Sequence, residues 1–228
     1  MYIDDRGLVI QTVRCDDTTL LVHLFTQSHG CAVFSVRRPK SAHTRTSSIL
    51  PLLAPLSFLT FQWDCRPGIT VYRMRDVHPF LIHHTVASTP AKSAIALMLG
   101  EFLWHALRSE GENAALFDYL VNAFAWLDEA TTGYANFHLV LMLKVARFLG
   151  IDPTPEEWDE SLMEQPVSAL DIDTLCRLRE TSFETMNDIA LTGSDRSRLA
   201  HALEQWFCAH LPAFPPLKSL AVMESLFK

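Results

Sequence analysis

The residues with the clearest chemistry are four cations that follow a short apolar run. Arg37, Arg38, Lys40 and Arg45 stand within nine positions of one another, among serines and threonines. Guanidinium and ammonium groups bind phosphate through charge-assisted hydrogen bonds, and hydroxyl groups add further donors. This composition predicts a loop that contacts a sugar–phosphate backbone, although a cationic loop that only faces water has the same composition.

The distribution of charge points to the same part of the chain. The formal net charge is -7, but residues 1–86 carry nine Lys/Arg and six Asp/Glu, whereas residues 87–228 carry ten and twenty. Phosphate binding depends on local clusters of cations. We therefore expect a nucleic acid to bind the first third of the chain, where Arg14, Arg73 and Arg75 are further candidate contacts on charge alone.

Histidines provide the clearest candidate for a metal site. His78, His83 and His84 could bind zinc together with His29 or His43, because imidazole is a common zinc ligand. Their spacing of five residues and then one matches no ligand arrangement that we can derive. A polar surface is the simpler interpretation, and we expect no metal.

Motifs of common enzymes are absent from the sequence. The eight glycines are too far apart for a P-loop or a dinucleotide fingerprint, and neither GxSxG nor HExxH occurs. We expect a protein without a catalytic site or a cofactor.

Cysteine usage favours a reducing compartment. The five cysteines are an odd number and form no CxxC pair, so a disulfide framework is not indicated. The sequence shows neither a signal peptide nor a run of eighteen apolar residues. These features favour a cytoplasmic protein that does not associate with a membrane.

The elements that must position these residues fall into two parts, of which the first is typical of short β-strands. Apolar runs rich in β-branched and aromatic residues lie at 7–13, 20–26, 31–36, 56–63 and 69–77. In the last run Tyr72 and Met74 face one way, and Arg73 and Arg75 face the other. Five strands in about 75 residues favour a closed OB-fold barrel over residues 1–78.

From residue 79 onward the apolar period is that of helices. Thr89-Pro90 predicts one helix start, Asn113 a second, and Gly150 a left-handed C-terminal cap. Ser182 and Ser194 are candidate N-caps of later helices. We expect an α+β protein in which the OB-fold precedes an all-α domain, residues 79–228, with an irregular insert near residues 152–168.

Aromatic residues of the predicted barrel are candidates for base stacking. OB-folds bind single strands along a basic groove in which bases stack on aromatic rings. Phe34, Phe58, Trp63 and Tyr72 are available for this role, although any one of them is more often part of a core.

Short motifs in order along the chain resemble the RecO recombination mediators of bacteria. The motifs are Gly7-Leu8-Val9-Ile10, Leu24-Phe25-Thr26 with Gly30, Arg37-Arg38-Pro39-Lys40-Ser41 with Leu50-Pro51-Leu52, Gly100-Glu101-Phe102-Leu103, Leu116-Phe117-Asp118-Tyr119-Leu120, Phe148-Leu149-Gly150-Ile151-Asp152-Pro153, and His210-Leu211 with Leu217-Lys218-Ser219-Leu220. Each motif is short, but their common order extends over nearly the whole chain.

This resemblance implies a DNA repair and recombination protein that is not an enzyme. It implies an OB-fold that binds single- and double-stranded DNA, with Arg37, Arg38 and Lys40 as DNA contacts, and the annealing of complementary strands. The resemblance also implies two direct partners, RecR and the C-terminal tail of the single-stranded-DNA-binding protein. With them the protein would help to load RecA on DNA, so RecA is an indirect partner. Such a protein would act in the bacterial cytoplasm, in association with the nucleoid.

Two departures from the family pattern matter. Many relatives carry a four-cysteine zinc element after the glycine that corresponds to Gly150, whereas residues 154–170 contain no cysteine, so a zinc site is predicted absent. Relatives often have an arginine before the phenylalanine that corresponds to Phe137, where it could receive the acidic tail, but Ala135-Asn136 stand here. Lys144 and Arg147, on the same predicted helix, are candidate substitutes.

A protein–protein adaptor is the main rival hypothesis. In that case the barrel would bind a peptide tail without touching DNA, and the cationic loop would be incidental.

Overall fold

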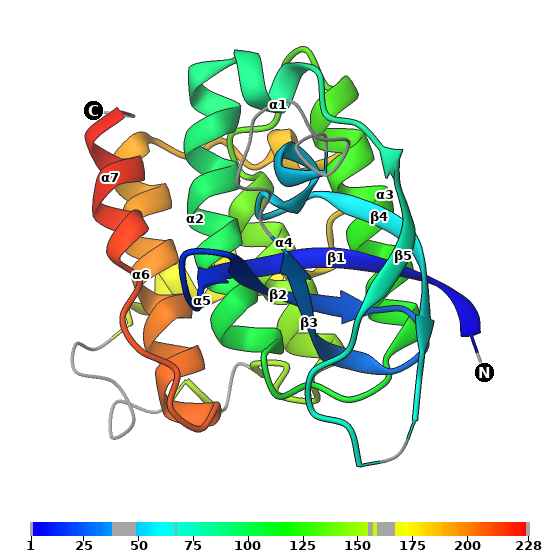
Figure 1. Ribbon diagram of the computed structural model, residues 1–228. Coiled ribbons are helices and arrows are strands. Elements are labelled where there is room, and N and C mark those ends of the chain that lie inside the picture. Colours follow the sequence, from blue (N-terminus) through cyan, green and yellow to red (C-terminus); the bar gives the residue numbers. More distant parts are fainter. Residues whose placement is uncertain (1, 38–48, 67, 155–156, 159–166, 227–228) are drawn as a thin grey trace. The chain divides into compact units, whose positions relative to one another are not determined.

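A computed structural model describes residues 2–37, 49–66, 68–154, 157–158 and 167–226 (Figure 1). The five strands are β1 (Tyr2–Arg14), β2 (Thr19–Thr26), β3 (Gly30–Arg37), β4 (Phe58–Asp64) and β5 (Met74–Leu81). They form one antiparallel sheet in the order β3-β2-β1-β4-β5. The predicted number of strands and the predicted α+β class are confirmed.

The two edges of this sheet are joined by a single bridge. Phe34 of β3 pairs in parallel with Tyr72, so that the Ser35 N–H donates to the Tyr72 carbonyl and the Tyr72 N–H donates to the Val33 carbonyl, both at 2.8 Å. Across the described ranges no longer ladder joins β3 to β5. The sheet therefore has the strand number of an OB-fold, but the barrel is not fully closed.

The last strand begins later than the sequence predicted. The predicted strand covers residues 69–77, whereas β5 runs from Met74 to Leu81. The backbone of Tyr72 pairs with β3 rather than with β4, and the ladder between β4 and β5 is irregular between Thr60 and Gln62. The chain thus reaches its partner β4 only after it has bridged the opposite edge.

Alternating apolar side chains of the strands form the core of the sheet. The rings of Phe34, Phe61 and Trp63 are almost fully buried, and Phe34 meets the other two edge-on at centroid distances of 5.2 and 5.3 Å. Edge-to-face packing is the favoured geometry for such aromatic contacts. The strands that the sequence predicts by alternation therefore owe their stability mainly to this buried layer.

One carboxylate is buried beside this core. Asp5 is 8% exposed and accepts hydrogen bonds from the Ser28 hydroxyl at 2.6 Å, the Trp63 indole N–H at 3.1 Å and the Arg6 backbone N–H at 2.8 Å. Buried polar groups are normally satisfied in this way. Asp5 thus links β1 to β4 and to the turn after β2.

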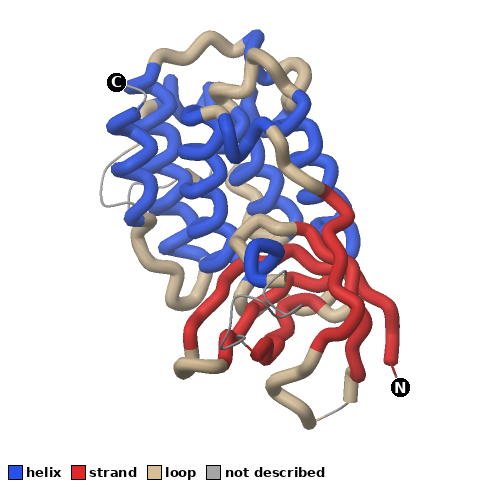
Figure 2. The backbone as a smooth tube through the Cα atoms, turned by 45° about the horizontal axis from the view of Figure 1, so that its top comes forward, coloured by secondary structure: helices blue, strands red, loops and turns tan. Residues whose placement is uncertain are grey.

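After the sheet, the described ranges contain seven α-helices, and helices are drawn in blue in Figure 2. They are α1 (Thr85–Ser88), α2 (Pro90–Leu107), α3 (Ala114–Glu129), α4 (Phe137–Phe148), α5 (Ala169–Glu180), α6 (Gly193–His210) and α7 (Lys218–Leu226). Among the described residues, none of the helices has both the length and the apolar character that a membrane span requires.

The chain divides into two compact units. One contains residues 1–83 and 100–121, which we call the sheet unit, and the other contains residues 84–99 and 122–228, which we call the helical unit. Both α2 and α3 contribute residues to each unit. The domain limits inferred from the sequence, 1–78 and 79–228, remain a prediction.

Helix ends agree with the sequence at some positions and not at others. Asn113 accepts a hydrogen bond from the Leu116 N–H at the start of α3, and Gly150 has the left-handed φ of 72° predicted after α4. Ser194 is not an N-cap, because Thr192 caps α6 in a reciprocal capping box with Asp195. This box matches the spacing of a polar residue followed three positions later by an acidic one.

Ser182 also fails to begin an α-helix. The segment that follows it forms only the short 3-10 helix Met186–Asp188. The side-chain amide of Asn136 donates to the carbonyls of Met186 and Ile189 at 3.0 and 2.9 Å. The Met186 carbonyl also accepts from the Ile189 backbone N–H, so the amide of Asn136 adds a tertiary contact at the end of this short helix.

The carboxylate of Asp128 supports the start of α1. It accepts hydrogen bonds from the backbone N–H groups of His84, Thr85 and Val86 at 3.0, 2.7 and 2.9 Å. Burial raises the pKa of Asp128, but these hydrogen bonds outweigh it and lower the pKa to about 2. Stability from this carboxylate is therefore present above its ordinary pKa and is lost as the pH falls toward about 2.

We predict that Asp128→Ala lowers the free energy of unfolding by about 1–2 kcal/mol, as the loss of a helix cap does. Urea unfolding monitored by circular dichroism measures the change. The neighbouring Glu129→Ala is the matched control, because Glu129 is exposed at the end of the same helix. Equal stability of the two variants would contradict the capping role.

Candidate nucleic-acid interface

Two of the predicted arginines line one hollow in the sheet unit. The hollow has a volume of about 510 Å³ and is lined by Arg37, Arg73 and the side chains of Thr19 and Ser35, together with Val36, Ile49 and Met74. Arg37 ends β3 and pairs with Thr19 of β2. No carboxylate is among the described residues that line this hollow.

The bridge at Tyr72 explains why Arg73 lies beside β3. Because the Tyr72 backbone pairs with Phe34, the next residue is placed near the end of the same strand. Tyr72 and Met74 are partly buried and pack against the core, whereas Arg73 and Arg75 are exposed, in the alternation that the sequence predicts. Two guanidinium groups with neighbouring hydroxyls can donate hydrogen bonds to a phosphate.

The other predicted cations are not part of this hollow, or cannot be placed. Arg14 forms an ion pair with Asp17, and its guanidinium also donates to the Asp16 carbonyl, so its charge is largely compensated. The guanidinium of Arg75 lies 4.4 Å from the centre of the Tyr2 ring. Three further predicted contacts lie outside the described residues, namely Arg38, Lys40 and Arg45.

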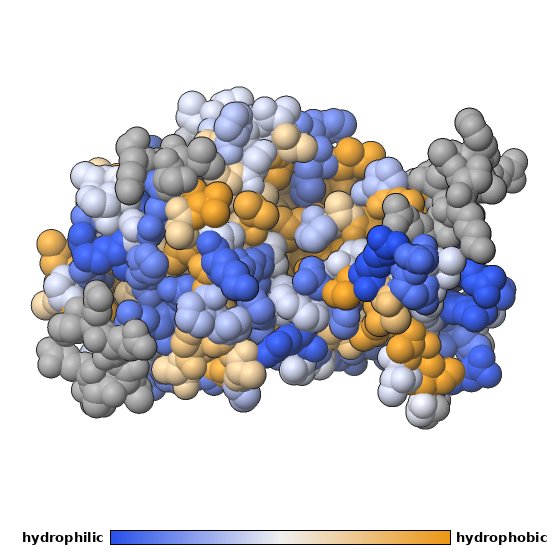
Figure 3. All heavy atoms as spheres, turned by 60° about the vertical axis from the view of Figure 1, so that its left-hand side comes forward, coloured by the Kyte–Doolittle hydropathy of each residue, from blue (hydrophilic) through white to orange (hydrophobic). Residues whose placement is uncertain are grey.

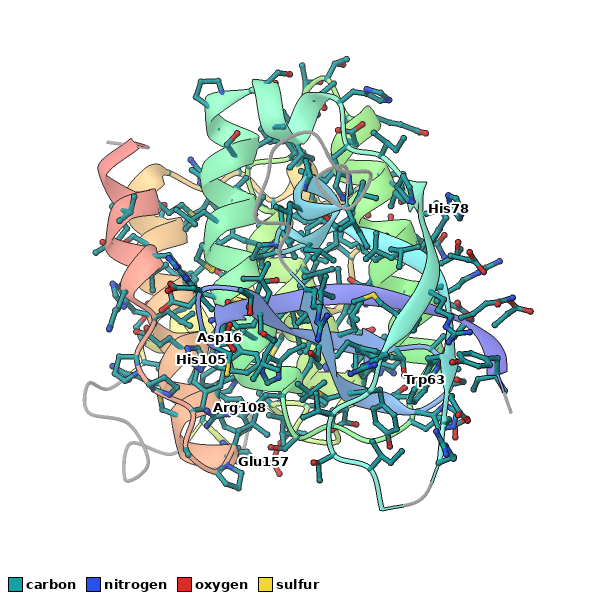
Figure 4. The ribbon with its side chains drawn as sticks, in the orientation of Figure 1. Asp16, Trp63, His78, His105, Arg108 and Glu157 are labelled. Atoms are coloured by element: carbon teal, nitrogen blue, oxygen red, sulfur yellow. The ribbon has the colours of Figure 1, made fainter. Side chains whose placement is uncertain are left out.

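Three of the four candidate stacking rings are unavailable to a base. Phe34, Phe58 and Trp63 are at most 1% exposed, so their stacking role is wrong and they belong to the core (Figure 4 labels Trp63). Tyr72 is partly buried, with its ring 4.6 Å from that of Trp63. Phe34 and Trp63 belong to the core of the sheet, whereas Phe58 faces the other way and packs against Phe80 and Phe117. A base would have to displace this packing to reach any of the three rings.

A larger hollow in the same unit has the opposite charge. It has a volume of about 710 Å³, and its lining includes Asp4, Asp76 and Glu112, with Arg6 and His78 as the basic members (Figure 4 labels His78). Carboxylates repel phosphate, so this acidic hollow is unsuited to DNA. Over the ranges that the structure describes, no three His, Cys, Asp or Glu side chains gather as metal ligands.

The predicted partner-binding residues on α4 differ in their surroundings. Lys144 is half-buried, and its ammonium donates to the Arg179 carbonyl at 2.6 Å. Burial lowers the pKa of Lys144. Arg147 is exposed. Of the two, only Arg147 presents a cation that is open to solvent.

Sequence reasoning missed a hollow in the helical unit, which we call the second hollow. It has a volume of about 500 Å³ and is lined from α4, α6 and α7, with Ala135, His138, Arg196 and Arg198 among its residues. Arg196 donates to the Leu191 carbonyl at 2.7 Å, whereas Arg198 is paired with Asp171 and Asp195. The only sequence signal was a pair of arginines just after the capping box of α6.

The histidine of this second hollow is uncharged. Burial, and to a lesser extent the charge of Arg196, lower the pKa of His138 to about 3. Its ring is therefore neutral at physiological pH, and the positive charge of the second hollow comes from its arginines.

Large exposed apolar side chains do not mark a further interface on the face drawn in Figure 3. There, hydrophobic and hydrophilic atoms are intermixed. The large exposed apolar residues in the described ranges come from several elements, and they are Tyr2, Val13, Ile69, Val71, Ile82, Leu97, Leu170 and Val222. Single exposed apolar residues are normal in folded proteins.

Comparison with known proteins gives matches over most of the chain. The family model "Recombination protein O N terminal" matches residues 1–80, and "Recombination protein O C terminal" matches residues 87–156. The chain is 34% identical to a DNA repair protein RecO of Phocaeicola vulgatus and 32% identical to one of Bacteroides fragilis, each alignment covering 97% of both chains. A DNA repair protein RecO of Flavobacterium psychrophilum is 26% identical, with full coverage of both chains.

The burial of Phe34 gives a test of its role in the core. Phe34→Ala should lower the free energy of unfolding by about 3–5 kcal/mol, the range for a buried phenylalanine. The exposed Tyr2→Ala should change it by less than about 1 kcal/mol. Chemical denaturation measures both. A Phe34→Ala protein that kept its stability but lost DNA binding would restore the stacking role.

Proposed function

Because the chain belongs to the recombination protein O family, and so has a role in DNA repair, we propose that it is a recombination mediator that binds DNA through its sheet unit. It binds single- and double-stranded DNA, anneals complementary strands, and helps RecR and the single-stranded-DNA-binding protein to load RecA. It catalyses no covalent step. It works in the bacterial cytoplasm, at the nucleoid.

The observation that carries this proposal is the cationic hollow lined by Arg37 and Arg73. Two complementary strands repel each other through their phosphates, and cations held between or beside them offset that repulsion. Residues 87–228 carry twenty Asp/Glu against ten Lys/Arg. An acidic remainder of this kind repels DNA, which favours binding at the cationic part of the chain.

The remaining candidate DNA contacts can be ranked by their neighbours. Arg38, Lys40 and Arg45 follow Arg37 directly in the sequence and are proposed to extend its phosphate contacts. Arg14 and Arg75 are weaker candidates. The first is paired with Asp17, and the second lies over the Tyr2 ring.

The second hollow supports a proposal for the acidic-tail partner. The arginine that the family pattern places before Phe137 is absent, but Arg196 of α6 brings a guanidinium to a hollow that Ala135 also lines. Arg196 has no ion pair with a carboxylate in the part of the chain that the structure describes, so its charge is available to a partner. We therefore place the tail at this hollow, with Arg147 and Lys144 as the alternative surface.

We predict that Arg37→Glu and Arg73→Glu each weaken DNA binding by about tenfold or more, because a hydrogen bond to a charged group contributes about 1.5–3 kcal/mol. Each should also reduce the slope of log affinity against log salt concentration by about one, the contribution of one phosphate contact. Fluorescence anisotropy with oligonucleotides at several salt concentrations gives both quantities, and a strand-annealing assay should show the same order of defects.

The matched control is Arg177→Glu, which reverses an exposed cation on α5. It should leave both affinity and salt dependence unchanged. The combined replacement of Arg37, Arg38 and Lys40 by Glu should remove most binding. If the wild-type protein ignored oligonucleotides in dilute buffer but captured the tail, the adaptor hypothesis would replace this one.

For the tail, we predict that Arg196→Gln weakens binding of a peptide with the C-terminal sequence of the single-stranded-DNA-binding protein by roughly tenfold. Glutamine removes the charge and keeps a polar side chain, and circular dichroism checks that the variant is folded. Isothermal titration calorimetry measures the affinity. A loss in Arg147→Glu but not in Arg196→Gln would place the tail on the exposed surface of α4 instead.

A further inference from the structure

A histidine of α6 lies between two carboxylates from different helices. The Nδ1 of His201 is 3.1 Å from Oε2 of Glu204 on α6, and its Nε2 is 2.9 Å from Oε1 of Glu224 on α7. The side chains of Glu204 and Glu224 are 11% and 23% exposed and that of His201 is 47% exposed, so water screens these contacts in part. We call these three residues the His201 clamp.

Both carboxylates of the clamp make a second contact. The backbone N–H of Leu217, just before α7, donates to Oε1 of Glu204. The hydroxyl of Ser197 on α6 donates to Oε1 of Glu224. The clamp therefore connects α6 both to the start of α7 and to a position near its end.

The geometry requires a particular protonation state. A neutral imidazole has one N–H and one lone pair, whereas the imidazolium has two N–H groups. With carboxylate oxygens at both ring nitrogens, only the imidazolium donates in both directions. A neutral ring would direct a lone pair at one of the two carboxylates.

We propose that the proton on His201 holds α7 against α6, and that its loss releases α7. The hydrogen bond to Glu204 raises the pKa of His201, burial opposes this, and the charge of Glu224 adds to the increase. A raised pKa means that the stabilisation is complete below the ordinary value of histidine. It disappears as the pH rises through the raised value.

The charged groups that face the ring are Glu204 from its own helix and Glu224 from α7. Both are acidic, so loss of the proton leaves two carboxylates near a neutral ring. The buried apolar side chains of Leu220 and Met223 in α7, and of Leu217 just before it, do not depend on the proton. Release is therefore a graded loosening of α7 and not a general unfolding.

The second hollow gives this loosening a consequence. Met223 and Glu224 of α7 line that hollow together with Arg196 and Arg198. The position of α7 thus affects the shape of the hollow. When His201 loses its proton, the charge of Glu224 at the hollow is no longer offset by the imidazolium. An effect on tail binding rests on the function proposed above, whereas the clamp itself does not.

Hydrogen exchange of the α7 amides tests the clamp without DNA or peptide. After correction for intrinsic exchange rates, mass spectrometry from pH 5.5 to 9 should show that wild-type protection of α7 falls roughly two- to fivefold, the range for a partly exposed ion pair. The fall should coincide with the titration of the His201 ring followed by NMR. Protection that stayed constant across this titration would overturn the proposal.

Two variants and a control make the test specific. His201→Gln should show low α7 protection at every pH and no step, because its side chain stays neutral. Glu224→Gln should shift the His201 titration to lower pH, which a merely structural glutamate would not do. His78→Gln, an exposed histidine of the sheet unit, should keep the wild-type step. A step that persisted in His201→Gln would refute the clamp.

Discussion

Two backbone hydrogen bonds between Tyr72 and β3 determine where the cations of the sheet unit meet. The pairing brings Arg73 near the end of β3, which Arg37 terminates. Because Tyr72 pairs with β3, the fifth strand begins later than the sequence predicts. The pairing also holds the Tyr72 ring beside Trp63. Core packing and the cationic hollow thus share one piece of backbone, so the hollow depends on the integrity of the core beneath it.

Much of the fold follows from local patterns in the sequence. The strands were predictable because apolar residues alternate, and Gly150 was predictable because few other residues adopt a positive φ at a helix end. The cap of α5 was missed, although Ser168 and Asp171 have the spacing of a capping box, as do Thr192 and Asp195. After Ser182 the expected helix is replaced by a short 3-10 segment, and the contact of that segment with Asn136, some fifty residues away, has no local signal in the sequence.

The candidate site was predictable only in part, for a similar reason. Charge alone placed cations in the first third, but it could not distinguish Arg73, which lines the hollow, from Arg14, which is paired with Asp17. Alternation gave the face of each aromatic ring without showing which face is buried. Arg196 could not be connected with Ala135 from sequence, because about sixty residues separate them and only tertiary structure brings them to one hollow.

The sheet unit contains an acidic hollow as well as a cationic one, so carboxylates and guanidinium groups line different hollows of the same unit. A polyanion that approaches such a body experiences a torque before it makes any contact, because one region attracts it and another repels it. Encounters would then begin in a restricted set of orientations. If DNA binds as proposed above, its phosphate backbone rather than its bases would face the cationic hollow, which leaves the base edges free.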